Sequence, residues 1–255
     1  MDKVKLYLKR LGFPDDVKIE HTYNFLKEIQ YRQVTTIPYE NVDIINNIPL
    51  SLKIDDLFDK IVTKQRGGYC FEVNALLSFI LKEMGFEVKD YFARFLRGEE
   101  TIPMRRHRIM IVKCSEGEYL LDAGVGSQAP RYPLKLELDT IQNQFGESYK
   151  FEKDSLLGWV MCEKHQDEWR RVFSFNEDIQ LDVDFEIPSF YCEKSPDSKF
   201  NKGLMISLKT DTGRKTVDKD TYKEFTGSEV TLIRENLSPD EMDKVLKEVF
   251  NIYTV

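Results

Sequence analysis

Three side chains of the types used in nucleophilic catalysis stand out along the chain: Cys70, His107 and Asp122. A thiol attacks as its thiolate, and a free cysteine with a pKa of about 8.5 supplies little thiolate at neutral pH. An imidazole can take the thiol proton, and a carboxylate can hold that imidazole in one tautomer. We therefore predict a Cys-His-Asp triad for acyl transfer through a thioester. The residue types alone do not separate transfer to an amine from hydrolysis or peptide cleavage.

The position of Cys70 favours a reactive thiol. It follows the turn Arg66-Gly67-Gly68 and begins an apolar pattern with helical spacing, which Gly85 ends. A helix N-terminus stabilises negative charge through its unpaired N–H groups and its dipole. We expect the two glycines to adopt positive φ and to allow a close backbone approach. The apolar positions of the predicted helix are Val73, Leu76, Leu77, Ile80, Leu81 and Met84.

The segment 107–124 predicts how His107 meets Asp122. It alternates as a β-hairpin with a two-residue turn at Ser115-Glu116, so that residue 114 faces residue 117. In that register His107 and Asp122 are diagonal neighbours on one face, about 7–8 Å apart. One more residue in the turn would put them on opposite faces. We expect the carboxylate to accept a hydrogen bond from the imidazole Nδ1.

The composition is that of a soluble globular chain. Of 255 residues, 41% are hydrophobic, and 37 basic against 44 acidic side chains give a net charge of −7. This charge argues against general binding to nucleic acid or to anionic membranes. The charged start lacks the apolar core of a signal peptide, and no apolar run approaches the roughly 18 residues of a membrane span. The four cysteines are widely spaced without a metal-ligand pattern, so we expect reduced thiols, a cytoplasmic location and no metal.

The order of the predicted elements indicates an α+β fold. Helical patterns occupy 2–10, 21–33, 55–64 and 70–84, and short β-branched or aromatic segments follow from about residue 87. Ser238-Pro239 begins a final helix, with acids in its first turn. We predict an N-terminal helical bundle, a β-rich middle part, and strands with a terminal helix.

Several motifs together resemble the arylamine N-acetyltransferases, over about residues 1–255. Ile37-Pro38-Tyr39-Glu40-Asn41-Val42 is similar to the family's I-P-F-E-N-L segment, and residues 66–72 are similar to its R-G-G-x-C-x-E motif. Residues 122–126 stand where the family has D-V-G-F-G, and residues 195–200 resemble its S-P-x-S-x-F segment.

The resemblance implies a three-part architecture with a cysteine-protease-like core. A helical bundle with the nucleophilic cysteine spans 1–88, a β-barrel with His and Asp spans 89–190, and an α/β lid spans 191–255. It also implies ping-pong transfer from acetyl-CoA to arylamines, hydrazines or N-hydroxyarylamines, and a role in xenobiotic metabolism. The implied partners are these small molecules, without nucleic acid or membrane, and the implied state is a monomer or a weak homodimer. Cys70 and His107 are expected as a thiolate–imidazolium pair.

The resemblance also assigns roles around the triad. Arg106, Gly126 and Phe200 are expected at the CoA cleft, and Phe71 and Val125 at the acceptor. Val125 replaces the family's usual aromatic residue, which implies a wider acceptor pocket. Two further departures are Ala123 in the same motif and Lys194 before the S-P segment.

Charged residues beside these motifs have two readings. Arg105, Arg106 and Arg108 form either a cationic patch for the cofactor's phosphates or a solvated group of charges. Arg66 and Glu72 are expected to form a salt bridge that holds the glycine turn, rather than to act in catalysis.

Two other functions are compatible with parts of the pattern. A cysteine hydrolase or transglutaminase-like enzyme would use the same triad, although no papain-type C-G-S-C-W surrounds Cys70. A non-enzymatic small-molecule binding protein could keep the fold, and an intact triad argues against it. Release of CoA that depends on an amine favours acetyl transfer, whereas peptide cleavage favours the hydrolase.

Overall fold

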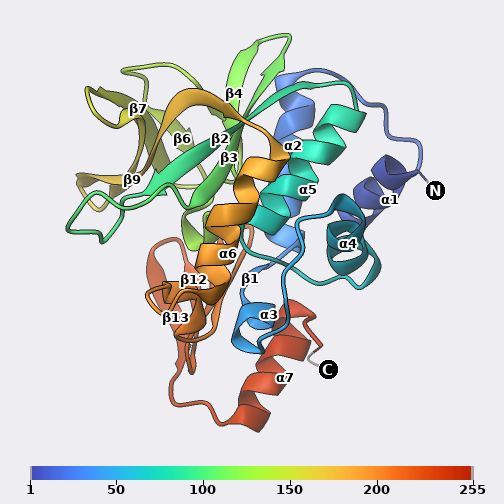
Figure 1. Ribbon diagram of the computed structural model, residues 1–255, viewed down its shortest axis with the longest axis vertical. Coiled ribbons are helices and arrows are strands. Elements are labelled where there is room, and N and C mark those ends of the chain that lie inside the picture. Colours follow the sequence, from blue (N-terminus) through green and yellow to red (C-terminus); the bar gives the residue numbers. More distant parts are fainter. Residues whose placement is uncertain (1, 254–255) are drawn as a thin grey trace.

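Helices fill the first part of the chain. The computed structural model describes residues 2–253, and residues 1 and 254–255, which belong to the first and last predicted parts, lie outside the described residues. The predicted helices at 2–10, 21–33 and 70–84 are confirmed within a few residues, whereas 55–64 forms a short helix followed by the π-helical stretch η1 (Asp59–Thr63). The α-helices of this part are α1 (Lys3–Arg10), α2 (Tyr23–Thr36), α3 (Val42–Ile45), α4 (Ile54–Phe58) and α5 (Cys70–Glu83) (Figure 1).

An eight-stranded antiparallel sheet forms a nearly closed barrel. Its strands follow the order β5-β4-β3-β2-β9-β8-β7-β6. Side-chain amides join its two edge strands: Gln142 accepts from the Lys135 N–H at 2.7 Å, and Gln144 accepts from the Tyr132 N–H at 2.6 Å. The strands are β2 (Glu87–Phe95), β3 (His107–Cys114), β4 (Gly117–Leu121), β5 (Leu134–Lys135), β6 (Gln142–Gln144), β7 (Glu147–Asp154), β8 (Gly158–His165) and β9 (Glu168–Gln180).

The hairpin that carries His107 has the predicted register. Cys114 pairs with Gly117, and the ladder continues to Met110 opposite Leu121. The two-residue turn is therefore confirmed, and with it the shared face of His107 and Asp122.

A second, five-stranded sheet lies beside the barrel. Its order is β1-β10-β11-β12-β13, so the short strand β1 joins strands from the far end of the chain. The predicted terminal helix is confirmed, with the Ser238 hydroxyl accepting from the Glu241 N–H. The elements are β1 (Tyr39–Glu40), β10 (Met205–Lys209), β11 (Gly213–Asp218), β12 (Thr221–Thr226), β13 (Glu229–Arg234) and α7 (Pro239–Phe250).

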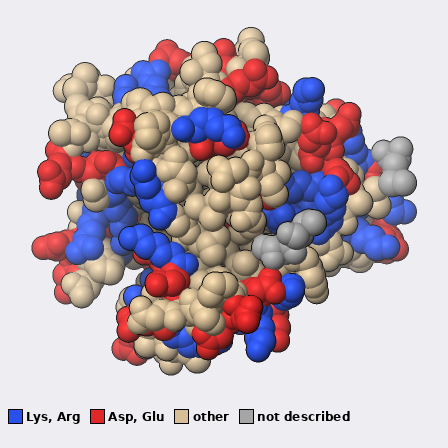
Figure 2. All heavy atoms as spheres, turned by 60° about the horizontal axis from the view of Figure 1, so that its bottom comes forward, with Lys and Arg blue, Asp and Glu red and all other residues tan. Residues whose placement is uncertain are grey.

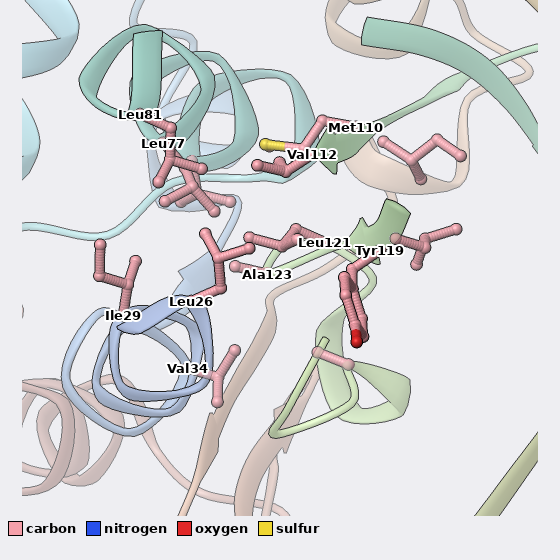
Figure 3. Packing of buried hydrophobic residues seen from close by; sticks show 14 of the residues in the cluster. Leu26, Ile29, Val34, Leu77, Leu81, Met110, Val112, Tyr119, Leu121 and Ala123 are labelled. Atoms are coloured by element: carbon pink, nitrogen blue, oxygen red, sulfur yellow. The ribbon is translucent and has the colours of Figure 1, made fainter. Parts of the chain in front are cut away.

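The main core lies between α2, α5 and the β3–β4 hairpin. Figure 3 shows Leu26 of α2 and Leu77 of α5 pointing toward Met110, Val112 and Leu121 of the hairpin. Burial of these apolar side chains from water stabilises the arrangement. The packing fixes α5, and so its first residue Cys70, against the strand that begins at His107.

Helix α6 (Glu186–Lys194) was not predicted from the sequence. It follows the 3₁₀ turn η3 (Asp182–Phe185), and in Figure 1 it is the orange helix at the centre of the view. Its apolar residues occupy two faces, because Phe185 and Cys192 point inward while Ile187 and Phe190 are exposed. A helix that is apolar on two sides shows no clear period of 3.6 residues.

The three-part division of the chain stays a prediction, as does the cysteine-protease-like core. Helices dominate to residue 83, the barrel strands end at residue 180, and the boundary expected at 190/191 falls inside α6. Among the described helices, none has the length and apolar character needed to span a membrane. Basic and acidic side chains are interspersed over the face shown in Figure 2.

Candidate active site

Cys70 is the first residue of α5, as the sequence predicts. The Glu72 carboxylate accepts from the Tyr69 N–H at 3.1 Å and so caps the helix start. Neither Gly67 nor Gly68 has positive φ, which corrects the expected backbone conformation. Their role is close approach: a Cβ at Gly67 would lie 2.0 Å from the Pro38 carbonyl oxygen, so only glycine lets the two segments meet.

A network of ion pairs holds this turn, with partners that differ from the predicted Arg66–Glu72 bridge. Arg66 binds Glu40 at 2.8 Å and Asp43 at 2.9 Å. Lys60 binds Asp43 at 2.6 Å and Glu72 at 2.7 Å. The sequence could not indicate these pairs, because Glu40 and Asp43 come from a distant segment. The expectation that Arg66 and Glu72 hold the turn rather than act in catalysis stays a prediction.

His107 and Asp122 form a buried hydrogen-bonded pair. The imidazole Nε2 and the Asp122 Oδ2 are 2.7 Å apart, and both side chains are almost fully buried. The carboxylate thus receives Nε2–H rather than the predicted Nδ1–H. Because Nε2–H donates to the Asp122 carboxylate, the neutral ring has an unprotonated Nδ1, which is the atom available as a base.

Asn74 is a site residue that sequence reasoning missed. It lies one helical turn after Cys70, is fully buried, and donates to Asp122 Oδ1 at 2.9 Å and to the Arg108 carbonyl at 2.6 Å. Its own oxygen accepts from the Ala123 N–H at 3.0 Å. A buried asparagine needs such partners, so an amide inside the apolar run after Cys70 was the available signal.

The loop after Asp122 packs closely against Cys70. Gly124 N–H donates to Asp122 Oδ1 at 2.8 Å. A Cβ at Gly124 would lie 2.7 Å from the Cα of Cys70 and 2.9 Å from Asn74 Nδ2. This close approach brings the carboxylate loop against the start of α5.

One cavity of about 630 Å³ is lined by both Cys70 and His107. Cys70 and His107 line it together with Val125, and the cavity extends between the barrel and the five-stranded sheet. Cys70 is 2% exposed, so its sulfur meets this cavity rather than the outer surface. The His107 ring packs against Phe173, with ring centroids 5.6 Å apart. A molecule that enters the cavity therefore reaches the thiol and the imidazole at one place.

Burial governs the ionisation of Cys70. It raises the pKa of the thiol well above its ordinary value, and the Cys192 and Asp122 groups act in the same direction. Backbone hydrogen bonds at Arg108 and Phe71 act in the opposite direction. Burial thus acts against a free thiolate at this position. The thiolate–imidazolium pair expected from the resemblance stays a prediction.

Neither of the two readings of Arg105, Arg106 and Arg108 describes the three arginines as a group. Arg108 is 1% exposed and binds Asp90 at 2.9 Å and Asp182 at 2.6 Å. Arg105 lies 3.6 Å from Asp178. Arg106 lines the cavity, with its guanidinium 2.8 Å from Glu99. Ion pairs with carboxylates of the same chain therefore neutralise most of this positive charge.

The other expected site residues divide between the cavity and the interior. Gly126, Phe200 and Val125 line the cavity. Phe71 does not line it: the ring is fully buried and packs against Phe185 and Tyr69. Phe71 follows Cys70 directly, so its side chain points elsewhere around the helix.

Strands β10 to β12 contribute cavity residues that the sequence did not indicate. Arg214, Lys219 and Lys223 line the cavity from this sheet. In the sequence they look like ordinary charges of an exposed hairpin. Only the folded structure shows that these residues lie at the cavity.

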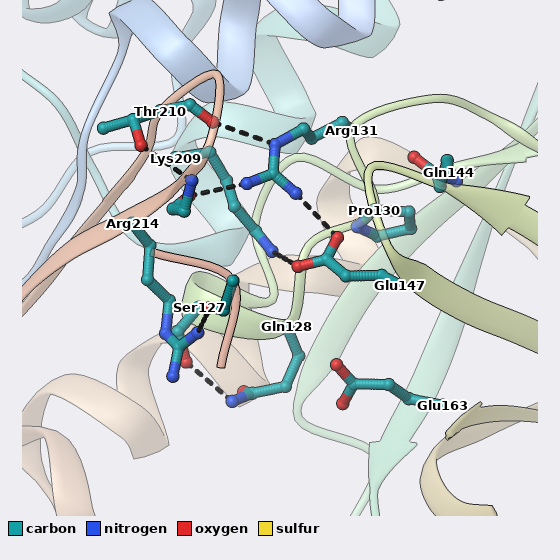
Figure 4. A network of polar contacts seen from close by, with 12 residues as sticks. Ser127, Gln128, Pro130, Arg131, Gln144, Glu147, Glu163, Lys209, Thr210 and Arg214 are labelled. Carbon is teal, nitrogen blue, oxygen red and sulfur yellow. Dashed lines mark hydrogen bonds and ion pairs between the residues drawn. The ribbon is translucent and has the colours of Figure 1, made fainter. Parts of the chain in front are cut away.

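Arg131 holds the β10–β11 turn to the barrel (Figure 4). It donates to the Thr210 carbonyl at 3.0 Å and the Gly213 carbonyl at 2.6 Å, and it binds Glu147 at 2.8 Å. Lys209 binds the same carboxylate at 2.8 Å. Burial alone raises the pKa of Glu147, but Lys209 and Arg131 outweigh it, so the net shift is downward. Arg131 therefore fixes the wall of the cavity that carries Arg214.

All four cysteines are free. No group of three ligating side chains suited to a metal ion occurs among the residues that the structure describes.

Comparisons with known proteins agree on one family. A family model described as N-acetyltransferase matches residues 22–254. An arylamine N-acetyltransferase of Mycobacterium tuberculosis is 34% identical over 199 residues, which are 76% of this chain and 70% of that protein.

Solved structures are similar over nearly the whole chain. A structure of arylamine N-acetyltransferase from M. tuberculosis has a TM-score of 0.91 at 29% identity, covering 99% of this chain and 93% of that one. A Mycobacterium marinum arylamine N-acetyltransferase in complex with CoA has a TM-score of 0.89 at 27% identity, covering 98% and 92%. These likenesses confirm the predicted α+β fold.

Proposed function

Since this chain belongs to the arylamine N-acetyltransferase family, we propose that it moves an acetyl group from acetyl-CoA to an aromatic amine, a hydrazine or an N-hydroxyarylamine through a thioester on Cys70. The observation that carries the proposal is the cavity shared by Cys70 and His107, with Asp122 hydrogen-bonded to His107 Nε2 at 2.7 Å. The shared cavity offers the thiol and the imidazole to one substrate, and the carboxylate orients the imidazole, which supports this chemistry.

The first half-reaction acetylates the enzyme. Nδ1 of His107 takes the Cys70 proton, and the sulfur attacks the carbonyl carbon of acetyl-CoA. The carbon–sulfur bond to CoA breaks, and CoA leaves as a thiol with the proton from the imidazolium. The Asp122 carboxylate stabilises the positive ring while it exists.

The second half-reaction transfers the acetyl group. The amine nitrogen attacks the Cys70 thioester, and His107 accepts the proton that this nitrogen loses. The carbon–sulfur bond to Cys70 breaks, the amide leaves, and the sulfur regains a proton. Because burial disfavours the free thiolate, proton return from His107 favours release of the product.

The volume of the cavity, its basic residues and a related structure with CoA support acetyl-CoA as the donor. The related M. marinum structure contains CoA. The present cavity of about 630 Å³ lies in the range of cofactor sites, and the basic Arg214, Lys219 and Lys223 on its wall suit phosphate groups. We propose that Arg106, Gly126 and Phe200 contact the cofactor.

The acceptor side is proposed to be wider than in relatives with an aromatic residue at position 125. Val125 lines the cavity near the thiol, with Tyr39 also on its wall. Acceptors larger than aniline are therefore expected to fit. Four free cysteines suit a reducing compartment, and we propose the cytoplasm.

Incubation with acetyl-CoA and aniline tests the function. CoA release that requires the amine, together with formation of acetanilide, is the expected result. The alternative, a cysteine hydrolase or transglutaminase-like enzyme with the same triad, predicts peptide cleavage or glutamine transfer instead. Either of those activities without acetanilide would contradict the proposal.

A further inference from the structure

A carboxylate lies among the basic residues of the cavity. Glu99 lines the cavity together with Arg106 and Lys199. One oxygen of Glu99, Oε1, is 2.8 Å from the Arg106 guanidinium and 2.7 Å from the Lys199 ammonium. The Glu99 side chain is only 18% exposed. A single carboxylate oxygen therefore joins two positive groups inside a cavity that is proposed to take an anionic cofactor.

The partners of Glu99 come from two separate segments. Glu99 and Arg106 belong to the loop between β2 and β3, whereas Lys199 begins the 3₁₀ turn η4 (Lys199–Asn201). Phe200, which is proposed to contact the cofactor, lies in the same turn. The Glu99 ion pairs thus connect two elements of the cavity wall at the place where the cofactor is expected.

Backbone contacts fix the position of Glu99. Gly98 has a φ of 73°, in the left-handed region that favours glycine, and the Glu99 N–H donates to the Leu96 carbonyl at 3.1 Å. The Leu96 N–H donates to the Val172 carbonyl of β9 at 2.8 Å. The turn is therefore anchored to the barrel, and it holds the carboxylate at the cavity.

The other acidic residues of the cavity do not occupy its basic residues in this way. Asp218, Asp220 and Glu235 also line the cavity, and none of them forms an ion pair within the part of the chain that the structure describes. Lys219 lies near η4, because a Cβ at Gly203 would be 2.7 Å from its Cγ. Glu99 is thus the cavity acid that neutralises basic side chains of the same cavity.

This pairing opposes the binding of phosphate. Phosphate groups bind arginine and lysine through charge-assisted hydrogen bonds, and Arg106 and Lys199 already make such bonds to Glu99. A phosphate group that binds either residue must displace a carboxylate that is already in place. The negative charge of Glu99 also repels the incoming group.

We propose that Glu99 sets the affinity of the cavity for the phosphate groups of CoA by competing with them for Arg106 and Lys199. The inference rests on the proposed function, because it takes CoA as the ligand of this cavity. Glu99 is a specificity-determining residue in this account, since it acts on the anionic end of the donor. Weaker binding also speeds the release of CoA, which must precede entry of the amine in the proposed ping-pong reaction.

Isothermal titration calorimetry of the complete chain with CoA tests the competition. Glu99→Gln keeps the shape of the side chain and removes its charge, and it is expected to lower the Kd for CoA about fivefold at about 20 mM salt. The gain should fall below about twofold at roughly 500 mM salt, where the Debye length is about 4 Å.

Glu87→Gln is the matched control for the change in net charge. Glu87 binds Lys89 and Lys113 on the surface of the barrel and is not among the residues that line the cavity. It should leave the Kd for CoA unchanged at both salt concentrations. Thermal unfolding of each variant shows whether the chain stays folded.

A second substitution tests the competition at Lys199, whose side chain is 62% exposed. Lys199→Met alone should raise the Kd for CoA less than about twofold, because Glu99 already neutralises the ammonium. In the Glu99→Gln background the same substitution should raise it about threefold or more, because the freed ammonium then binds phosphate.

Three results would overturn the competition. They are a Glu99→Gln chain that binds CoA no more tightly than the wild type, a gain that persists unchanged at high salt, and an effect of Lys199→Met that is the same with and without Glu99. CoA binding by both chains with any of these results would leave the proposed function untouched. A wild-type chain and a Glu99→Gln chain that both fail to bind CoA would overturn the proposed donor as well.

Discussion

Hydrogen bonds restrict the proposed base and its orienting acid to one orientation. Asp122 uses one oxygen for His107 Nε2 and the other for Asn74 and the Gly124 N–H. The amide of Asn74 in turn reaches the backbone of Arg108, next to His107. Asn74 thus connects the helix of the nucleophile to the strand of the base. We assign it as a positioning residue, since it acts on the reaction through Asp122.

Asn74→Ala is expected to lower kcat by roughly 10–100-fold, because Asp122 loses a donor and His107 can shift from its productive position. The KM for acetyl-CoA should change little, since Asn74 is fully buried behind the site. The pH profile of kcat/KM should move as well, because the imidazole loses part of its fixed partner. Steady-state kinetics over a pH series measure both effects.

The matched control is Asn143→Ala, which removes an exposed amide whose oxygen accepts from Ser148 on the barrel edge. It should leave kinetics unchanged. If Asn74→Ala lowered the melting temperature and left the pH profile in place, Asn74 would be only a structural residue.

Val125→Phe is expected to narrow the acceptor end of the cavity, which Val125 lines. The kcat/KM for an aniline with a bulky para substituent should fall about tenfold or more, while that for aniline itself should stay close to wild type. Competition between the two amines measures the ratio directly. An equal change for both acceptors would show that position 125 does not set acceptor size.

At the scale of elements, local patterns predicted what lies close in sequence. The spacing after Cys70 predicted α5, and the alternation over 107–124 predicted the hairpin register that puts His107 and Asp122 on one face. Contacts between segments that are distant in the sequence could not be predicted from it. Strand β1 pairs with β10, and the partner of the Nε2 proton depends on ring packing that no spacing encodes.

Helix α6 and the residues of the cavity wall could not be predicted from the sequence either. The two-sided apolar pattern of α6 hides its period, and the charges of β11 and β12 look solvated until the sheet is placed beside the barrel. Residues such as Arg214 are cavity residues because Arg131 clamps their hairpin. Their role therefore follows from tertiary packing alone.

Arg131→Met is expected to destabilise the fold by about 3–5 kcal/mol, because it leaves Glu147 with less positive charge and two carbonyls without their donor. Urea unfolding measures the change. Arg171→Met is the matched control: its guanidinium is 47% exposed beside Asp154, and exposed ion pairs contribute about 0–1 kcal/mol. Equal destabilisation by the two variants would contradict the clamp.

At the scale of the whole molecule, the reaction site lies where three layers meet. The helical part supplies Cys70, the barrel supplies His107 and the nearby Asp122 loop, and the five-stranded sheet supplies the outer wall of the cavity. Helix α6 covers the cluster around Cys70 from outside. The proposed two-step transfer suits this arrangement, because in that proposal donor and acceptor use one cavity in turn and meet one thiol.

Intact mass spectrometry after exposure to acetyl-CoA without an acceptor tests the thioester most directly. One acetyl group on the wild-type chain, located at Cys70 and removed by aniline as acetanilide forms, is the predicted result. Cys70→Ala should gain none and form no product. Acetanilide formed by a chain that never carries an acetyl group, or carries it on another residue, would contradict the account.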